Sequence, residues 1–224
     1  MQVDFAAKEL TVKLVYYGPA LSGKTTNLRA IHWLAASNTR GALMTLETQN
    51  DRTLFFDMLP ITVSSQSGLK VRLKLFTVPG QVMHNTTRRL VLQAADGVAF
   101  VADSQRSEES ANRESFTNLK QNLTEIGIDP ERIPIIIQFN KRDLEGIRTD
   151  AELEMIAARS RAKIYKAVAT RGYGVVQTLL GLVRETWNSL EKEHGLEEKF
   201  GINPTRLMTE VESTLKHDAK RHGR

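Results

Sequence analysis

One stretch decides the fold of this chain: Gly18-Pro19-Ala20-Leu21-Ser22-Gly23-Lys24-Thr25, which has the spacing of a phosphate-binding loop. The run before it, 10–17, is rich in strand-favouring residues, and the apolar periodicity after Lys24 predicts a helix. In that setting the loop's N–H groups can surround phosphates at the positive end of the helix. We expect Lys24 to reach the β- and γ-phosphates of a nucleoside triphosphate, Thr25 to bind Mg²⁺, and Thr26 to lie beside them. The alternative is a glycine-containing turn that matches the pattern by chance.

A second signature, Asn140-Lys141-Arg142-Asp143, follows an apolar run over 133–139 that suits a strand buried on both faces. Asp143 at the end of such a strand can accept hydrogen bonds from the N1–H and N2–H₂ groups of guanine. Adenine lacks this pair of donors and would leave the carboxylate unpaired, which is costly. We expect the Lys141 stem to cover the purine and Asn140 to tie this segment to the phosphate loop. Taken alone, the tetrapeptide could also be an ordinary polar turn.

The composition excludes several classes of protein. The 224 residues suit one α/β domain with an appendage, and the absence of cysteine excludes disulfides and thiolate metal sites. No secretory signal, run of about 18 apolar residues or lipidation motif appears, so we predict a cytoplasmic protein without an integral membrane segment. The net charge is +5, of which +3 lies in 216–224. Because this excess lies in a tail rather than along an aromatic-lined strand, we predict no nucleic-acid partner.

The order of the expected elements predicts an α/β fold. Two β-like runs, 59–63 and 69–76, flank a polar segment and predict one antiparallel hairpin. Alternating strands and helices follow it to about Leu190. This order predicts a mostly parallel central sheet with helices on both faces, and ligand loops at the carboxyl ends of the strands. Both signatures fall at such ends.

The composition changes after Gly195, which divides the expected nucleotide-binding domain, 1–195, from an extension, 196–224. The segments 197–199 and 201–204 are interpreted as a linker, and at its end Asn203 as N-cap and Pro204 at the first helical position would open a helix. One face of that helix is apolar and is formed by Leu207, Met208, Val211 and Leu215. Two roles stay open for this amphipathic, basic extension: a solvated or core-docked helix, or a helix that contacts a partner or a membrane.

Four stretches of the chain, in the same order, resemble the bacterial MglA-type branch of the Ras-like small GTPases. They are Val15–Pro19 leading into Gly23–Leu28, then Asp51–Asp57, then Thr77–Gln81, and last Val101–Gln105 together with Asn140–Asp143. The resemblance extends from about Leu10 to Leu190. It implies a small-GTPase P-loop fold that binds GTP and GDP, and we expect the domain itself to be a monomer.

The resemblance also implies roles for residues between the two signatures. Thr53 would ligate Mg²⁺ and contact the γ-phosphate only in the triphosphate state. Gly80 would donate its N–H to the γ-phosphate, and Gln81 would orient the attacking water, as in the general Ras scheme. Arg52 would act as an arginine finger supplied from the same chain, although an arginine beside a threonine is commonly a solvated surface charge.

Four further residues complete the expected site. Thr77 stands where most small GTPases carry an aspartate that holds Mg²⁺ through water, so Mg²⁺ binding would be weaker. Asp57 would either compensate in part or simply end the switch loop, and the second reading is favoured. After the strand near 164–168, the resemblance places Val168 at the base site and the Ala169 N–H on guanine O6.

The predicted function is a GTP-hydrolysing molecular switch that regulates cell polarity or gliding motility through effectors. The resemblance implies a Roadblock/LC7-domain activating protein, expected to be a dimer, and recruitment to a cell pole or inner membrane surface through partners. Two alternatives remain at this point: a module that holds GTP with negligible hydrolysis, and a P-loop nucleotide kinase or ATPase. The second would leave Asn140–Asp143 unexplained.

Overall fold

The computed structural model describes residues 1–46, 56–64, 68–81 and 84–216. The strands are β1 (Gln2–Asp4), β2 (Glu9–Tyr17), β3 (Met44–Leu46), β4 (Phe56–Ser64), β5 (Lys70–Thr77), β6 (Gly97–Asp103), β7 (Ile135–Asn140) and β8 (Ile164–Lys166). The α-helices are α1 (Lys24–Leu34), α2 (Asn85–Leu92), α3 (Glu109–Glu125), α4 (Asp150–Arg159), α5 (Val175–His194), α6 (Leu196–Phe200) and α7 (Pro204–Lys216). Two short 3-10 turns, η2 (Arg106–Glu108) and η3 (Ala169–Arg171), lie among them.

The described strands form a single sheet in the order β3-β4-β5-β2-β6-β7-β8, and β1 pairs with the start of β2. In this sheet order the neighbouring pairs β5-β2, β2-β6, β6-β7 and β7-β8 are parallel. The strands β4 and β5 form the predicted antiparallel hairpin. The sequence pattern did not indicate two short antiparallel pairings, β1 with β2 and β3 with β4. Each involves a strand of three residues, which is too short to show a periodicity. The predicted mostly parallel sheet with one hairpin is therefore confirmed, with extra short strands at its margins.

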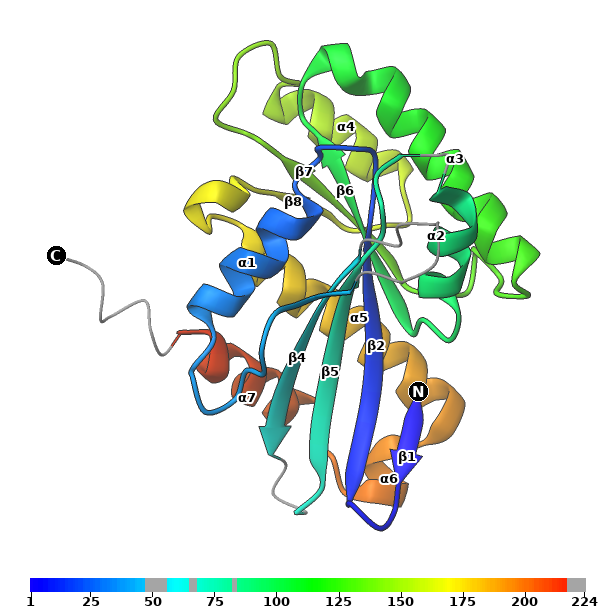
Figure 1. Cartoon of the computed structure of the whole chain (residues 1–224), viewed down its shortest axis with the longest axis vertical. Coiled ribbons are helices and arrows are strands. Elements are labelled where there is room, and N and C mark those ends of the chain that lie inside the picture. The colour runs from blue at the N-terminus through cyan, green and yellow to red at the C-terminus, as the bar shows by residue number, and fades with distance from the viewer. Residues whose placement is uncertain (47–55, 65–67, 82–83, 217–224) are drawn as a thin grey trace, which may run out of the picture.

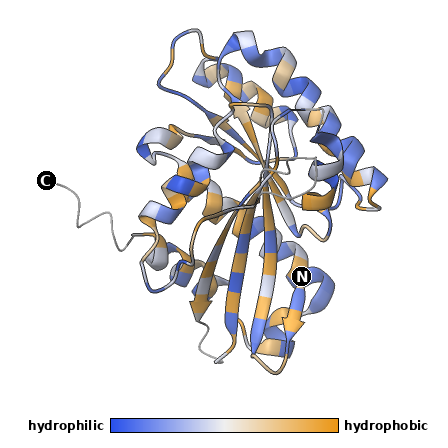
Figure 2. Cartoon of the chain, viewed as in Figure 1, coloured by the Kyte–Doolittle hydropathy of each residue, from blue (hydrophilic) through white to orange (hydrophobic). Residues whose placement is uncertain are grey.

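Helices cover both faces of the sheet, as Figure 1 shows, because successive side chains of each strand point to opposite faces. On β2, Leu14 and Tyr16 belong to a core shared with α1, α5 and α7, while Val15 and Tyr17 belong to a core shared with α2, α3 and α4. Figure 2 shows the resulting stripes of apolar residues along the central strands and polar residues on the outer helix faces. The sheet that carries the loops is therefore packed on both of its faces.

The C-terminal extension packs onto this core. Leu207, Val211 and Leu215 of α7 are almost completely buried in the cluster that includes α1 and α5. Asn203 caps α7, because its Oδ1 accepts a hydrogen bond from the Arg206 N–H at 3.2 Å, and Pro204 is the first helical residue, as predicted. Where the sequence indicates a linker, the structure has the short helix α6, whose Leu196 is fully buried. The described part of α7 is thus docked on the protein.

No helix within the described ranges is long and apolar enough to cross a membrane.

Candidate functional site

The phosphate loop joins the end of β2 to the start of α1, at the carboxyl edge of the parallel strands. Gly23 shows why this turn needs glycine: its φ of 97° lies in the left-handed region. A Cβ atom at Gly23 would also lie 2.2 Å from Nδ2 of Asn140. The loop is therefore packed directly against the end of β7, so the two sequence signatures meet in space.

Lys24 is buried at the floor of this loop. Its ammonium group donates hydrogen bonds to the carbonyl oxygens of Gly18, at 3.0 Å, and Pro19, at 2.6 Å. Burial, together with the nearby positive charge of Arg88, lowers the pKa of Lys24 to about 7. Neither effect is offset by a carboxylate, because no described residue forms an ion pair with Lys24. The lysine is thus positioned to gain from an anion in the loop.

Three side-chain oxygens meet beside Lys24. The Thr25 hydroxyl donates to Oδ2 of Asp57 at 2.6 Å, and the Thr77 hydroxyl donates to the same oxygen at 3.1 Å. The Asp57 N–H in turn donates to Oγ1 of Thr77 at 2.9 Å, and Thr45 donates to Asp57 Oδ1 at 2.9 Å. Hydroxyl and carboxylate oxygens are ligands suited to Mg²⁺. Among the described residues no group of three or more His, Cys, Asp or Glu side chains could hold a metal. A metal bound at this corner would therefore meet one carboxylate together with hydroxyl oxygens.

A cavity of about 370 Å³ connects the phosphate loop with the segment after β5. Its lining comprises Leu21, Gly23, Lys24, Thr25, Thr26, Asp57, Thr77, Val78, Pro79 and Gly80. Gly80 comes so close to the loop that a Cβ atom there would lie 2.3 Å from Cα of Ala20. Gln81 follows and is exposed. The expected γ-phosphate residues of this segment therefore lie at the mouth of the loop, whereas Arg52 and Thr53 lie outside the described residues.

The base side of the site is joined to the phosphate loop through Asn140. Its Nδ2 donates to the Ser22 carbonyl oxygen at 2.8 Å, which is the predicted tie between the two signatures. Its Oδ1 accepts the Ala169 N–H at 2.9 Å. The Ala169 N–H, expected to bind guanine O6, is therefore already paired within the protein and would have to exchange partners. Val168, the other residue expected there, is buried just before η3.

Lys141 and Asp143 follow Asn140 at the end of β7. The Lys141 ammonium group forms an ion pair at 2.6 Å with Asp103, which is almost fully buried at the end of β6. This contact anchors the lysine and leaves its apolar stem available as a flat support for a ring. Asp143 is partly exposed and lies 3.9 Å from the exposed guanidinium of Arg171. The carboxylate thus faces solvent at the rim, where a base could meet it.

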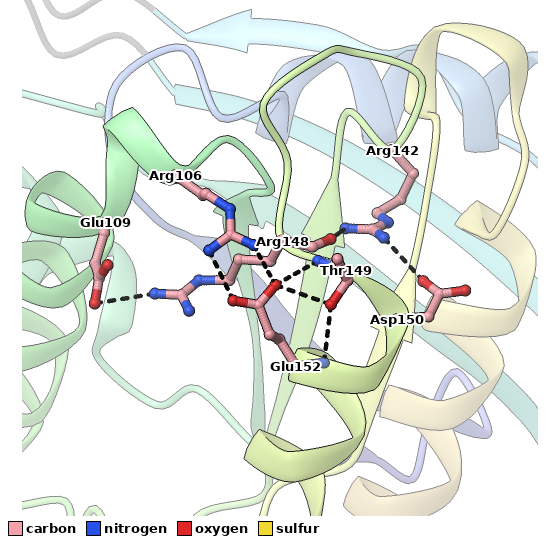
Figure 3. Close-up of polar contacts among 7 residues, drawn as sticks. All are labelled: Arg106, Glu109, Arg142, Arg148, Thr149, Asp150 and Glu152. Carbon is pink, nitrogen blue, oxygen red and sulfur yellow. Dashed lines mark hydrogen bonds and ion pairs between the residues drawn. The ribbon is translucent and has the colours of Figure 1, made fainter.

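Polar contacts fix the segment that carries Asp143, as Figure 3 shows. Arg142 donates to the Arg148 carbonyl oxygen at 2.7 Å and to the Asp150 carboxylate at 2.8 Å. Thr149 and Glu152 form a reciprocal capping box at the start of α4, and Arg106 binds both carboxylate oxygens of Glu152. The Lys166 hydrogen bond and the neighbouring cations hold the pKa of Asp150 below its usual value. Because Arg148 also forms an ion pair at 3.0 Å with Glu109 of α3, the segment is held in place by contacts with both α4 and α3.

Comparison with known proteins supports the same interpretation. The chain matches no protein-family model. It is 45% identical, over 190 residues, to the mutual gliding-motility protein MglA of Myxococcus xanthus (strain DK1622), and the match covers 85% of this chain and 97% of that protein. The chain belongs to the MglA family of bacterial Ras-like small GTPases. The mixed α/β architecture with a mostly parallel sheet is consistent with a small-GTPase fold.

Sequence reasoning missed two contacts in this MglA-family protein and undervalued a third. Asp57, favoured as an ordinary end of the switch loop, instead binds both Thr25 and Thr77. Asp103 belongs to a stretch that carried the resemblance, but its ion pair with Lys141 was not predicted. Arg88, an arginine within a short amphipathic helix, was not singled out although it is completely buried. The available signal was the same for each: a charged residue at a position where the pattern indicates burial.

Proposed function

We propose that this chain is a GTP-dependent molecular switch that binds GTP and GDP and hydrolyses GTP. The observation that carries the proposal is the pair of hydrogen bonds made by Asn140, which join the phosphate loop to the loop that follows β8. In this proposal the phosphate site and the guanine site are parts of a single unit, which the Asn140 contacts support. One ligand that carries both groups accounts for this arrangement more simply than two separate ligands.

The proposed chemistry assigns binding and orientation to the protein. Lys24 and the loop N–H groups hold the phosphates, the Gly80 N–H meets the γ-phosphate, and Gln81 orients a water molecule. Thr25 and Thr53 would hold Mg²⁺, with Asp57 beside Thr25. When bound, this ion neutralises charge on the phosphate oxygens. Arg52 would stabilise the charge that develops in the transition state, an effect worth roughly 10³–10⁵ in rate.

We further propose that the switch acts in gliding motility or cell polarity. The support is the 45% identity with a protein named for mutual gliding motility. In this proposal a dimeric Roadblock/LC7-domain protein stimulates hydrolysis, effectors bind in one nucleotide state, and partners bring the cytoplasmic protein to a cell pole or inner membrane surface. Loss of the γ-phosphate would release the contacts of Thr53 and Gly80, which changes the surface that effectors meet.

The test combines binding and turnover. Affinities for GTP, GDP and ATP are measured first, and phosphate release is then followed with and without a Roadblock-domain protein. We expect guanine nucleotides to bind preferentially and the partner to accelerate release. In Arg52→Ala we expect GTP binding to be retained and stimulated release to be nearly lost, whereas Arg113→Ala, which removes an exposed arginine of α3, leaves both unchanged.

Each alternative predicts a distinct result in this test. Preference for ATP would overturn the guanine assignment and favour a kinase or ATPase. Tight GTP binding without phosphate release, even with the partner, would favour a module that only holds GTP. Undiminished stimulated release in Arg52→Ala would leave the switch proposal standing but remove the arginine finger from it.

A further inference from the structure

Arg88, on the inward face of α2, is a completely buried cation. Among the described residues no carboxylate forms an ion pair with it. Burial of an uncompensated charge is costly, so such a residue is retained only where its hydrogen bonds or its charge have a use. The structure shows what its hydrogen bonds do.

The Arg88 guanidinium binds two successive backbone carbonyl groups in the segment after β5. Its Nε donates to the Pro79 carbonyl oxygen at 2.9 Å, and its Nη2 donates to the Gly80 carbonyl oxygen. The Pro79 carbonyl and the Gly80 N–H belong to one planar trans peptide and point in opposite directions. By holding the carbonyl, Arg88 therefore fixes the direction of the Gly80 N–H. Pro79 and Gly80 line the phosphate cavity, and Arg88 lies behind them.

A rigid polar cluster fixes Arg88 itself. Its Nη1 donates to Oδ1 of Asn118 at 2.6 Å, and its guanidinium lies 5.1 Å from the centre of the Tyr17 ring. The Asn118 Oδ1 also accepts hydrogen bonds from the Tyr17 hydroxyl, at 2.6 Å, and from Asn122, at 3.0 Å. The side-chain partners of the guanidinium are thus the Asn118 amide of α3 and, at 3.3 Å, the Tyr17 hydroxyl of β2, and neither is charged. An amide orients the arginine without neutralising its charge.

The uncompensated charge acts on the phosphate loop. Lys24 lines the cavity, and Arg88 is bound to the carbonyl groups of Pro79 and Gly80, which line it as well. Two buried positive charges near the same cavity repel each other when the loop holds no anion. An anion bound between the loop and Gly80 would relieve this repulsion. The relief would be greatest for an anion whose negative charge lies nearest Pro79 and Gly80.

We infer that Arg88 is a positioning residue that makes this switch selective for a nucleoside triphosphate over a diphosphate. It holds the Pro79–Gly80 peptide so that the Gly80 N–H is presented to the terminal phosphate, and it supplies positive charge from behind that peptide. A nucleoside diphosphate lacks the terminal phosphate, so it gains from neither the oriented Gly80 N–H nor the charge of Arg88. This inference rests on the proposed function, because it assumes that the loop binds a guanine nucleotide.

The experiment compares Arg88→Met with Arg89→Met in the full-length protein. Arg89 is the adjacent residue, is partly exposed and forms an ion pair with Glu125, so it is a matched control outside the site. Affinities for a non-hydrolysable GTP analogue and for GDP are measured by displacement of a fluorescent nucleotide in Mg²⁺. For Arg88→Met we expect about a tenfold loss of affinity for the analogue, as for a lost hydrogen bond to a charged group, with GDP affinity unchanged. Arg89→Met should alter neither.

Circular dichroism and thermal unfolding show whether each variant is folded. A second variant, Arg88→Lys, makes a milder change and keeps the inference testable if Arg88→Met does not fold. Lysine keeps the charge but lacks the planar fork that holds two carbonyls, so we expect a smaller loss that is again confined to the analogue. Equal losses for analogue and GDP in both variants would mean a structural role alone and would overturn the inference. Unchanged selectivity would also overturn it. If the wild-type protein binds neither nucleotide, the proposed function fails, and the inference fails with it.

Discussion

The base side and the phosphate side of the site differ in how their polar groups are satisfied. On the base side, Asn140, Lys141 and the segment after them make contacts that can persist when a ligand binds, although the Ala169 N–H would leave Asn140 to bind the base. On the phosphate side, Lys24 donates to carbonyl groups of its own loop and Thr25 donates to Asp57, so the groups that should meet phosphate and metal are paired with each other.

This difference indicates a division of labour. In the proposed function, base recognition would be largely built into the fold, because the supporting residues are held by β6, β7 and α4. Phosphate and metal binding must instead exchange internal hydrogen bonds for bonds to the ligand. A switch needs this arrangement. It holds the same base in both nucleotide states, whereas its contacts with the terminal phosphate must differ between those states. The predictions below test the two sides separately.

The largest effect is expected at the base. Asp143→Asn replaces an acceptor of two hydrogen bonds by a group that also donates, so one guanine donor is left facing an NH₂ group. We expect the affinity for GTP and GDP to fall about a hundredfold and the affinity for XTP to rise, because the amide can donate to the additional oxo group. Nucleotide displacement assays measure both changes. Glu145→Gln, an exposed carboxylate two residues away, is the control and should change neither affinity. Unaltered GTP affinity in Asp143→Asn would remove Asp143 from the base site.

The next effect tests the connection between the two sides. Asn140→Ala leaves the Ser22 carbonyl and the Ala169 N–H without their partner, each of which costs about 1–3 kcal/mol when buried. We expect GTP and GDP affinity to fall together by at least about tenfold, and the unfolding temperature to drop by roughly 5–10 °C. Thermal unfolding with and without nucleotide checks both. A loss confined to one nucleotide would contradict the idea that Asn140 serves the whole site.

A smaller effect is expected at the metal corner of the phosphate side. Asp57→Asn removes the carboxylate charge beside Thr25 and Thr77 but keeps a side chain of the same size. We expect the Mg²⁺ concentration needed to slow nucleotide release to rise about tenfold. Thr45→Val removes one hydrogen bond to Asp57 and keeps the charge, so it should leave the Mg²⁺ requirement near that of wild type. Equal behaviour of these two variants would mean that the charge of Asp57 does not serve the metal.

The same two sides show what the sequence can and cannot predict. The setting of the phosphate loop between a strand and a helix, and its tie to Asn140, were predictable because each signature is continuous and follows a strand. The contact of Asp143 with the base stays a prediction. The hydrogen bonds of Asp57 and Arg88 were not predictable, because their partners belong to other segments of the chain, from 8 to 71 residues away. The local pattern places both charged side chains on a buried face, but it does not show which groups they contact. The helix α6 was missed for a different reason, since five residues are too few to display a helical period.

The smallest effect concerns protons at Lys24. Its pKa is lowered from 10.5 to about 7 in the nucleotide-free protein, so the unfolded chain binds more protons than the folded chain between these values. The free energy of unfolding should therefore rise as the pH increases from about 7 toward 10. Phosphates in the loop favour the charged lysine, so nucleotide binding above pH 7 should take up about one proton. Calorimetry of GDP binding at pH 8.5, in buffers with different ionisation enthalpies, measures this uptake. Lys24→Arg keeps its proton at every pH used and should show none at saturating nucleotide. Binding by the wild-type protein without proton uptake at pH 8.5 would mean that Lys24 is already charged in the empty loop, and that the phosphate side is as fully prepared for its ligand as the base side.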